Sequence, residues 1–281
     1  MNTRQAEFLS KMLCTCWNID KLRGRTVLSG MVRAFFKNER PDEDVSGNAL
    51  PKMQLLGDVA LIPLYGILGI DVPDWLKEFG IDLTDANDIE EELEEALEDE
   101  NVRMIVIDVD SPGGLAIAGD KLFALVEAAN RRKPVLAFCG DGRSMASAAY
   151  EAVAGATVLY CGPYADGVGC IGSYLAYLDD TEFWAQMGIT WEIFKSGEIK
   201  GIGESVPLTE AQRSFLQEKV NRFGANIRRN VSRYRLAIAP DDMEGQWYDG
   251  IEAARRGFVG ANVSDLQTAI AKFRPLISFA A

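Results

Sequence analysis

Short apolar runs and amphipathic stretches alternate through the middle of this chain. Four apolar runs, each bounded by turn residues, have the length and character of buried strands. They cover residues 58–65, 104–110, 134–139 and 157–161. Because helical patterns separate strands that recur about every 25 residues, the sequence predicts an α/β fold with parallel strand pairing.

The clearest predicted helix covers residues 87–100, where apolar residues recur every three or four positions opposite a strongly acidic face. Asn87 is predicted to cap this helix, and Glu90 to complete a capping box. Further helices are predicted around residues 122–129, 144–154 and 209–235.

The chain is predicted to have two parts. Residues 1–50 form a helical N-terminal arm and linker, with helix candidates at 3–17 and 27–36 and a polar, proline-containing stretch from 38 to 51. Residues 51–281 then form a single α/β domain.

Composition narrows the possible chemistry. The 281 residues include no histidine, which excludes the Ser-His-Asp and Cys-His mechanisms and removes the commonest zinc ligand. Any general base is therefore Lys, Asp, Glu, Tyr or Cys. The net charge of −13 disfavours nucleic acid as a partner, because an acidic protein repels phosphates.

No cofactor, metal site or membrane span is expected. The five cysteines are odd in number and irregularly spaced, which is typical of reduced thiols in a cytoplasmic protein. The chain contains neither a G-x-G-x-x-G motif nor a Walker loop. Its longest weakly charged stretch, residues 152–178, is rich in glycine and is interpreted as buried strands and turns.

Two strand ends carry residues suited to catalysis, since ligands collect at the carboxyl ends of strands in open α/β sheets. After the second predicted strand, the adjacent glycines of Ser111–Gly114 allow close backbone approach to a ligand, although a plain tight turn also fits. Ser147 lies just inside a predicted helix, where the N–H of Ala148 is available to hold an oxyanion. A capping serine in a tightly packed helix fits this pattern too.

A serine nucleophile needs a base, and lysine can serve when burial lowers its pKa towards neutrality. Lys195 and Lys200 stand beside glycines and apolar residues in one short segment. The residues alone do not choose between the two lysines, and either is equally compatible with a surface position.

Taken together, residues 57–270 resemble the signal peptide peptidase A family of serine peptidases, which belongs to the Clp protease/crotonase superfamily. The resemblance rests on Asp110–Gly114, on Met145–Tyr150 and on Lys195–Lys200 followed by Pro-Leu-Thr-Glu, in that order. It implies a Clp protease/crotonase-like fold of repeated β-β-α units. It also implies Ser147 as nucleophile, Lys200 as general base, and Gly114 and Ala148 as oxyanion donors.

One position departs from the family pattern. Family members often carry Gly-Ser-Ile-Gly after the nucleophile helix, and that serine orients the lysine. Cys170 stands at the serine's position here, and a thiol is a poorer hydrogen-bond partner. Either the lysine is oriented by a hydrogen bond to Cys170 or Ser173, or activity is expected to be reduced.

The resemblance further implies a ring-like homo-oligomer with its active sites facing inward. We expect the N-terminal arm and the helix at 209–235 to make the subunit contacts. In the absence of a membrane anchor, the chain resembles the phage and prophage peptidases that mature heads. Scaffold, portal or capsid proteins would then be its substrates, in the host cytoplasm or the procapsid interior. Three alternatives remain open: a cytoplasmic peptidase that degrades signal peptides, a non-catalytic capsid or scaffold partner, and a crotonase-type acyl-CoA enzyme.

Overall fold

The computed structural model describes residues 17–19, 51–72, 82–177, 179–204 and 206–278. The strands are β1 (Trp17–Ile19), β2 (Gln54–Leu56), β3 (Val59–Gly69), β4 (Leu83–Asp85), β5 (Met104–Leu115), β6 (Val135–Cys139), β7 (Ser144–Ala146), β8 (Val158–Cys161), β9 (Gly167–Gly169), β10 (Trp247–Tyr248) and β11 (Ala261–Asn262). The helices are α4 (Ala86–Glu98), α5 (Ala116–Asn130), α6 (Ala148–Val153), α7 (Thr181–Gln186), α8 (Glu210–Tyr234), α9 (Gly250–Arg255) and α10 (Leu266–Ser278), with a 3-10 turn at Pro240–Asp242.

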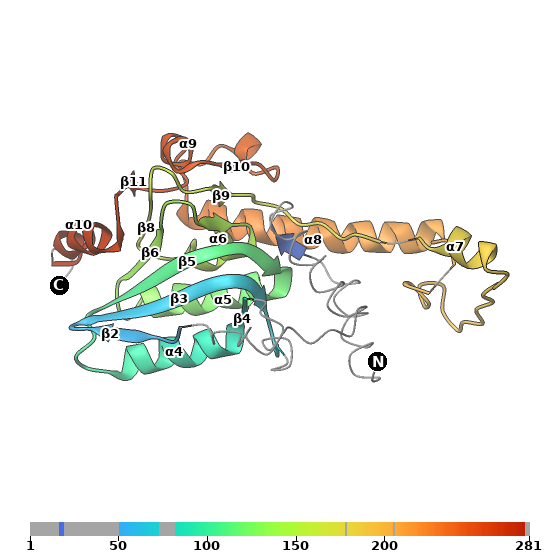
Figure 1. The fold of residues 1–281 in the computed structure, drawn as a ribbon, viewed down its shortest axis with the longest axis horizontal. Helices are drawn as coiled ribbons and strands as arrows, with labels where there is room; N and C mark the ends of the chain where they lie inside the picture. Colours follow the sequence, from blue (N-terminus) through green and yellow to red (C-terminus); the bar gives the residue numbers. More distant parts are fainter. Residues whose placement is uncertain (1–16, 20–50, 73–81, 178, 205, 279–281) are drawn as a thin grey trace.

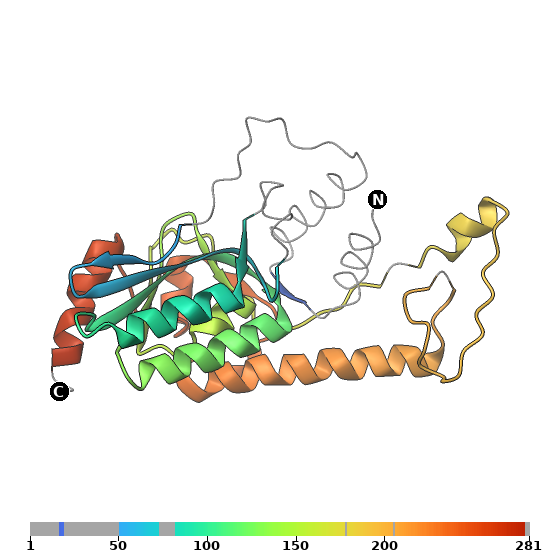
Figure 2. The ribbon, with the colours of Figure 1, turned by 90° about the horizontal axis from the view of Figure 1, so that it is seen from below.

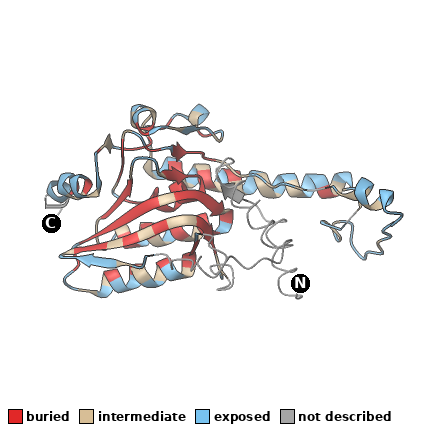
Figure 3. Cartoon of the chain, in the orientation of Figure 1, coloured by how far each residue is buried: buried red, intermediate tan, exposed pale blue. Residues whose placement is uncertain are grey.

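Helices cover both faces of the sheet, because alternate strand residues point to opposite sides. Ile62, Ile105 and Ala137 belong to the larger core, which α4, α5, α6 and α8 close. Met104 and Leu136 belong to a smaller core under α10. Figure 3 shows the buried residues concentrated along β3 and β5. The predicted α/β fold with parallel pairing is confirmed, since β3, β5, β6, β8 and β11 pair in parallel.

The central strand β5 has a different set of neighbours on each edge. Strand β3 pairs with one edge from Met104 to Gly114. The other edge pairs first with β6 at Ile105–Asp108, then with β7 at Ser111, and finally with β1 at Gly113–Leu115. The residues at the end of β5 are therefore flanked by β3 on one side and by β7 and β1 on the other.

Three local predictions are corrected by the structure. Helix α4 is capped by Asp85, whose side chain accepts from the Asn87 amide at 2.9 Å, because Asp85 has the extended backbone of a cap. Residues 144–146 are strand β7 and not the start of a helix, since pairing with β5 and β9 outweighs alanine's helical preference. Residues 111–114 continue β5 in place of the expected turn.

Helix α8 matches the prediction closely and begins with a capping box between Thr209 and Gln212. Only its second half packs on the core, through Gly224, Ile227 and Val231, which are buried. The first half of α8 continues away from the sheet, and residues 179–204 extend in the same direction (Figures 1 and 2). We call residues 179–204 the projecting arm.

The predicted N-terminal helical arm of residues 1–50 lies outside the described residues except for Trp17–Ile19. These three residues form β1, so the helix predicted for 3–17 is wrong at its last residue. Among the described helices, none has the length and apolar character needed to cross a membrane.

Candidate active site

Ser147 lies in a strained turn between β7 and α6. Its φ of 58° and ψ of −121° are uncommon for a residue with a side chain. The Ser147 amide donates to the Gly169 carbonyl at 2.7 Å, and its carbonyl accepts from the Glu151 amide at 2.9 Å. Because bonds on both sides fix this turn, Ser147 is held at the carboxyl end of a strand, where the residue as a whole is only 1% exposed.

The strand leading to Ser147 is anchored to its neighbour by polar contacts. The Ser144 amide donates to the Asp110 carboxylate at 3.1 Å. Arg143 forms an ion pair with Asp108 at 2.8 Å, and the Tyr65 hydroxyl also donates to Asp108. Burial and this hydrogen bond raise the pKa of Tyr65 to about 12, so Tyr65 stays neutral and keeps donating over the physiological range.

The end of β5 approaches other backbone segments too closely to carry side chains. The Ser111 hydroxyl accepts from the Gly113 amide at 3.1 Å, and Gly113 has a φ of 103° that favours glycine. A Cβ on Gly114 would lie 2.2 Å from the Leu68 carbonyl oxygen of β3. This close packing explains the paired glycines that the sequence showed.

Replacing Gly114 by alanine is expected to lower the free energy of unfolding by about 1–3 kcal/mol, because β3 must move to admit the methyl group. Gly140→Ala is the matched control, since its Cβ would meet nothing closer than Arg143 Cδ at 3.5 Å. Urea unfolding of both variants gives the comparison. Equal stability of Gly114→Ala and the wild type would show that β3 and β5 are less closely packed than described.

A cavity of about 550 Å³ opens beside Ser147. Three segments line it in addition to Ser147: the loop after β9, the middle of α8, and the loop that leads into β10. The lining residues are Cys170–Tyr174, then Gln217, Val220, Asn221, Gly224 and Arg228, then Glu244, Gly245 and Trp247. Cys170 and Ser173, which the sequence marked as lysine-orienting candidates, thus lie on the same cavity as Ser147.

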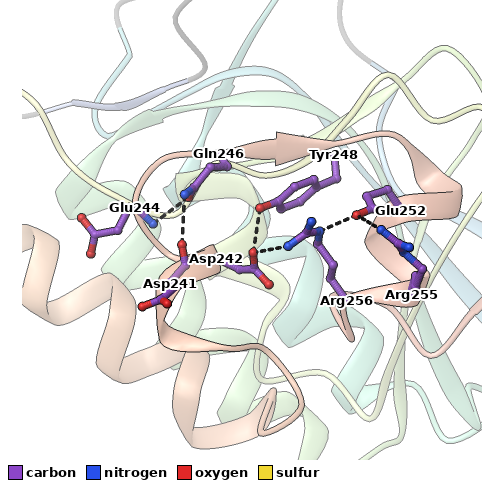
Figure 4. A network of polar contacts seen from close by, with 8 residues as sticks. All are labelled: Asp241, Asp242, Glu244, Gln246, Tyr248, Glu252, Arg255 and Arg256. Carbon is purple, nitrogen blue, oxygen red and sulfur yellow. Dashed lines mark hydrogen bonds and ion pairs between the residues drawn. The ribbon is translucent and has the colours of Figure 1, made fainter.

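The wall formed by the loop before β10 is fixed by a polar network (Figure 4). Asp242 accepts from the Tyr248 hydroxyl at 2.9 Å and pairs with Arg256 at 2.5 Å. The Gln246 side-chain amide donates to the Asp241 backbone carbonyl at 3.0 Å. The Gln246 backbone carbonyl accepts from the Cys170 backbone amide at 2.7 Å. These contacts therefore fix this wall of the cavity to α9 and to the loop after β9.

Helix α8 is anchored beside Ser147 by a buried carboxylate. Glu151, one turn after Ser147, is fully buried and accepts from Asn230 at 2.8 Å. The same Asn230 amide donates to Asp120 at 3.2 Å, so α5, α6 and α8 are joined. Sequence reasoning missed this α8 wall, because its polar residues resemble those of any solvated helix.

Lys200 is not among the residues that line this cavity. Its carbonyl accepts from Gln212 at 3.2 Å near the start of α8. Gln212 precedes Gln217, the first cavity residue of α8, by five positions, or about 7.5 Å of helix. Lys195 lies in the same arm and donates to the Glu198 carbonyl at 3.0 Å. The structure thus brings together Ser147, Cys170 and Ser173, but not Lys200.

No described group of three or more His, Cys, Asp or Glu side chains is arranged to hold a metal ion. The chemistry available at the cavity is that of a held hydroxyl, backbone N–H groups and a few polar side chains. That set suits nucleophilic attack on an acyl group.

Comparison with known proteins gives one family match. The sequence profile of peptidase family S49 matches residues 127–277. A protein of Methanocaldococcus jannaschii named as a protease is 30% identical over 175 residues, covering 59% of this chain and 54% of its own length. The head-tail preconnector protein GP5 of Enterobacteria phage P21 is 24% identical over 221 residues, covering 75% of this chain and 43% of its own length. The chain thus spans about half the length of these relatives.

Solved structures give weaker similarity. A mutant of the 1510-N membrane-bound stomatin-specific protease matches with a TM-score of 0.48 and 17% identity, over 78% of this chain and 86% of that one. A mutant of ClpP1 from Listeria monocytogenes matches with a TM-score of 0.48 and 15% identity, over 74% of this chain and 94% of that one. An enoyl-CoA hydratase from Shewanella pealeana matches with a TM-score of 0.46 and 12% identity, over 85% of this chain and 77% of that one.

Proposed function

Because this chain belongs to peptidase family S49, we propose that it is a serine endopeptidase with Ser147 as nucleophile and Lys200 as general base. The observation that carries the proposal is the strained Ser147 turn, which holds a serine on a 550 Å³ cavity directly after β7, the strand that pairs with β5 at Ser111. A serine at the end of a strand, followed directly by a helix, is a suitable position for a nucleophile.

In the proposed mechanism, Ser147 Oγ attacks a peptide carbonyl while the Lys200 amine takes its proton. The proton passes to the leaving amine, and water then hydrolyses the acyl-enzyme ester. The Ser147 amide is already bound to the Gly169 carbonyl, which leaves the amide of Ala148, the first residue of α6, and that of Gly114 as the proposed oxyanion donors.

We further infer that Lys200 acts on Ser147 of a neighbouring subunit. The projecting arm that carries Lys200 exposes Phe183, Met187, Trp191 and Phe194, with 47–88% of each residue accessible. Large apolar side chains gathered on a protrusion are typical of a subunit contact. A head-to-tail contact of this kind generates a ring if its rotation closes, as the ring-like homo-oligomer requires.

For the biological setting, we propose maturation of a phage or prophage head. The similarity to the phage P21 head-tail preconnector protein, which extends over 75% of this chain, favours that setting over degradation of signal peptides. Scaffold, portal or capsid proteins are then the proposed substrates.

The nucleophile is tested with an acylating β-lactone probe and mass spectrometry of the intact and digested protein. The wild type is expected to gain one probe mass on the peptide that contains Ser147. Ser147→Ala, shown by circular dichroism to be folded, is expected to gain none. Labelling of another serine, or no labelling of the assembled wild type, would contradict the proposal.

A further inference from the structure

Two opposite charges line the cavity beside Ser147. Arg228 comes from α8 and Glu244 from the loop before β10, so the charges stand on different walls. Among the described residues that line the cavity, no other is Asp, Glu, Lys or Arg. A charged substrate side chain that enters the cavity would therefore meet Arg228 or Glu244.

The Arg228 guanidinium lies over Gly224, one turn earlier on α8. A Cβ on Gly224 would lie 3.3 Å from Nη2 of Arg228 and 3.8 Å from its Cζ. Long side chains on a helix lean towards its amino end, and a glycine at this position leaves room for the guanidinium. Gly224 is buried and itself lines the cavity. The positive charge therefore belongs to the packed half of α8, on the side that borders the cavity.

The contact between Arg228 and Glu244 is loose. Nη1 of Arg228 lies 4.0 Å from Oε1 of Glu244, which is longer than a hydrogen bond. Among the contacts described, this ion pair is the guanidinium's only partner. Because a guanidinium has several N–H donors, Arg228 can still bind an acceptor that a ligand brings into the cavity.

The two charges also differ in their exposure. The Glu244 side chain is 68% accessible, and the Arg228 side chain is 40% accessible. Because water screens exposed ion pairs, a contact to Glu244 contributes less than a contact to Arg228. Glu244 also belongs to a loop, whereas Arg228 is held by a helix. Of the two residues, Arg228 is therefore the better placed to select a substrate.

We propose that Arg228 selects substrates that carry an aspartate or glutamate close to the scissile bond. The planar guanidinium matches a carboxylate, which would take the place of the Glu244 carboxylate beside Arg228. The chain has a net charge of −13, so long-range attraction does not favour acidic peptides, and the selectivity has to come from contact inside the cavity. This inference rests on the proposed function, because it names the substrate class of the same Ser147 site.

The first test locates the cuts that the wild type makes in a mixture of synthetic peptides with amidated carboxyl ends. Mass spectrometry of the products is expected to show aspartate or glutamate enriched close to the cut. Amidation removes the terminal carboxylate from the peptides. A preference that appears only with free carboxyl ends would overturn the inference, since the end of the chain and not a side chain would then be recognised.

A peptide that is cut is then made in three forms, with glutamate, glutamine or lysine at the enriched position. The wild-type kcat/KM is expected to be at least about tenfold higher for the glutamate form than for the glutamine form, because a hydrogen bond between charged groups is the stronger one. Arg228→Gln should remove this preference, and Arg228→Glu should reverse it in favour of the lysine form. A purely structural role of Arg228 would not reverse a preference.

Arg229→Gln is the matched control, since Arg229 is the neighbouring arginine on α8, is exposed and does not line the cavity. It should keep the wild-type preference. Glu244→Gln should strengthen the preference, because it removes the carboxylate that competes for Arg228. If the wild type favoured the lysine form and Glu244→Gln abolished that, Glu244 would be the selecting residue and the inference would be wrong.

The remaining outcomes separate this inference from the proposed function. All variants are compared after mass photometry shows the assembly of the wild type, and the response of Glu244→Gln decides if the Arg228 variants do not assemble. If cutting depends on Ser147 but ignores the glutamate, or if assembled Arg228→Gln keeps the preference, the inference on Arg228 is wrong and the proposed function stands. If the assembled wild type cuts no peptide, both are wrong.

Discussion

Ser147→Ala is expected to lower peptide hydrolysis by roughly 10⁴–10⁶-fold, because removal of a nucleophile leaves only binding and oxyanion stabilisation. The Ser147 side chain is buried in a fixed turn, so its replacement by the smaller alanine should leave the fold intact. The measurement is kcat/KM for a fluorogenic peptide at a protein concentration where the chain is assembled.

Ser232→Ala is the matched control, since Ser232 lies on α8 and its hydroxyl contacts only the Met243 sulfur at 3.6 Å among the contacts described. Its activity should remain close to that of the wild type. If Ser147→Ala kept more than a tenth of wild-type activity, Ser147 would not be the nucleophile.

Lys200→Ala is expected to cause a loss of similar size, and mixing it with Ser147→Ala is expected to restore activity. In the proposed assembly, a site is active when one subunit contributes Ser147 and its neighbour contributes Lys200. An equal mixture of the two inactive variants would therefore regain about a quarter of the wild-type sites if subunits exchange freely.

The matched control for this experiment is Lys195→Ala, because Lys195 lies in the same arm and its amine donates only to a nearby carbonyl among the contacts described. It should retain activity alone. If the mixture stays inactive although mass photometry shows mixed oligomers, Lys200 does not act across subunits, and a rearrangement within one chain would be required.

The sequence predicts the part of the fold that depends on short-range patterns. The apolar runs that become β3, β5, β6 and β8 are visible because each strand is buried on both faces. Helix α8 is equally visible, because its capping box is local.

The predictions that were wrong concern elements whose structure depends on partners distant in the sequence. Residues 144–146 read as helix, since nothing nearby reveals that β5 and β9 pair with them. Residues 111–114 read as a turn, since two glycines are ambiguous until Leu68 is known to pack against Gly114.

The site divides in the same way. Ser147 and the glycines stand beside strands and could be found from local motifs. The cavity wall formed by α8 and the loop before β10 could not be found, because residues such as Asn221 and Trp247 belong to no motif and share a cavity with Ser147 only through tertiary packing. The position of Lys200 was also beyond the sequence, which gives order along the chain but not the length of a projecting helix.

Only half of helix α8 packs on its own core, so in the proposed assembly the local concentration of the chain controls its activity. In that assembly, which we propose, its first half and the attached arm pack against another copy, so a solitary chain would carry a nucleophile without a base. Dilute protein would be dormant, and turnover would rise more steeply than in direct proportion to the amount of chain present. Such a peptidase would spare its surroundings during synthesis and become destructive only where many copies are confined together.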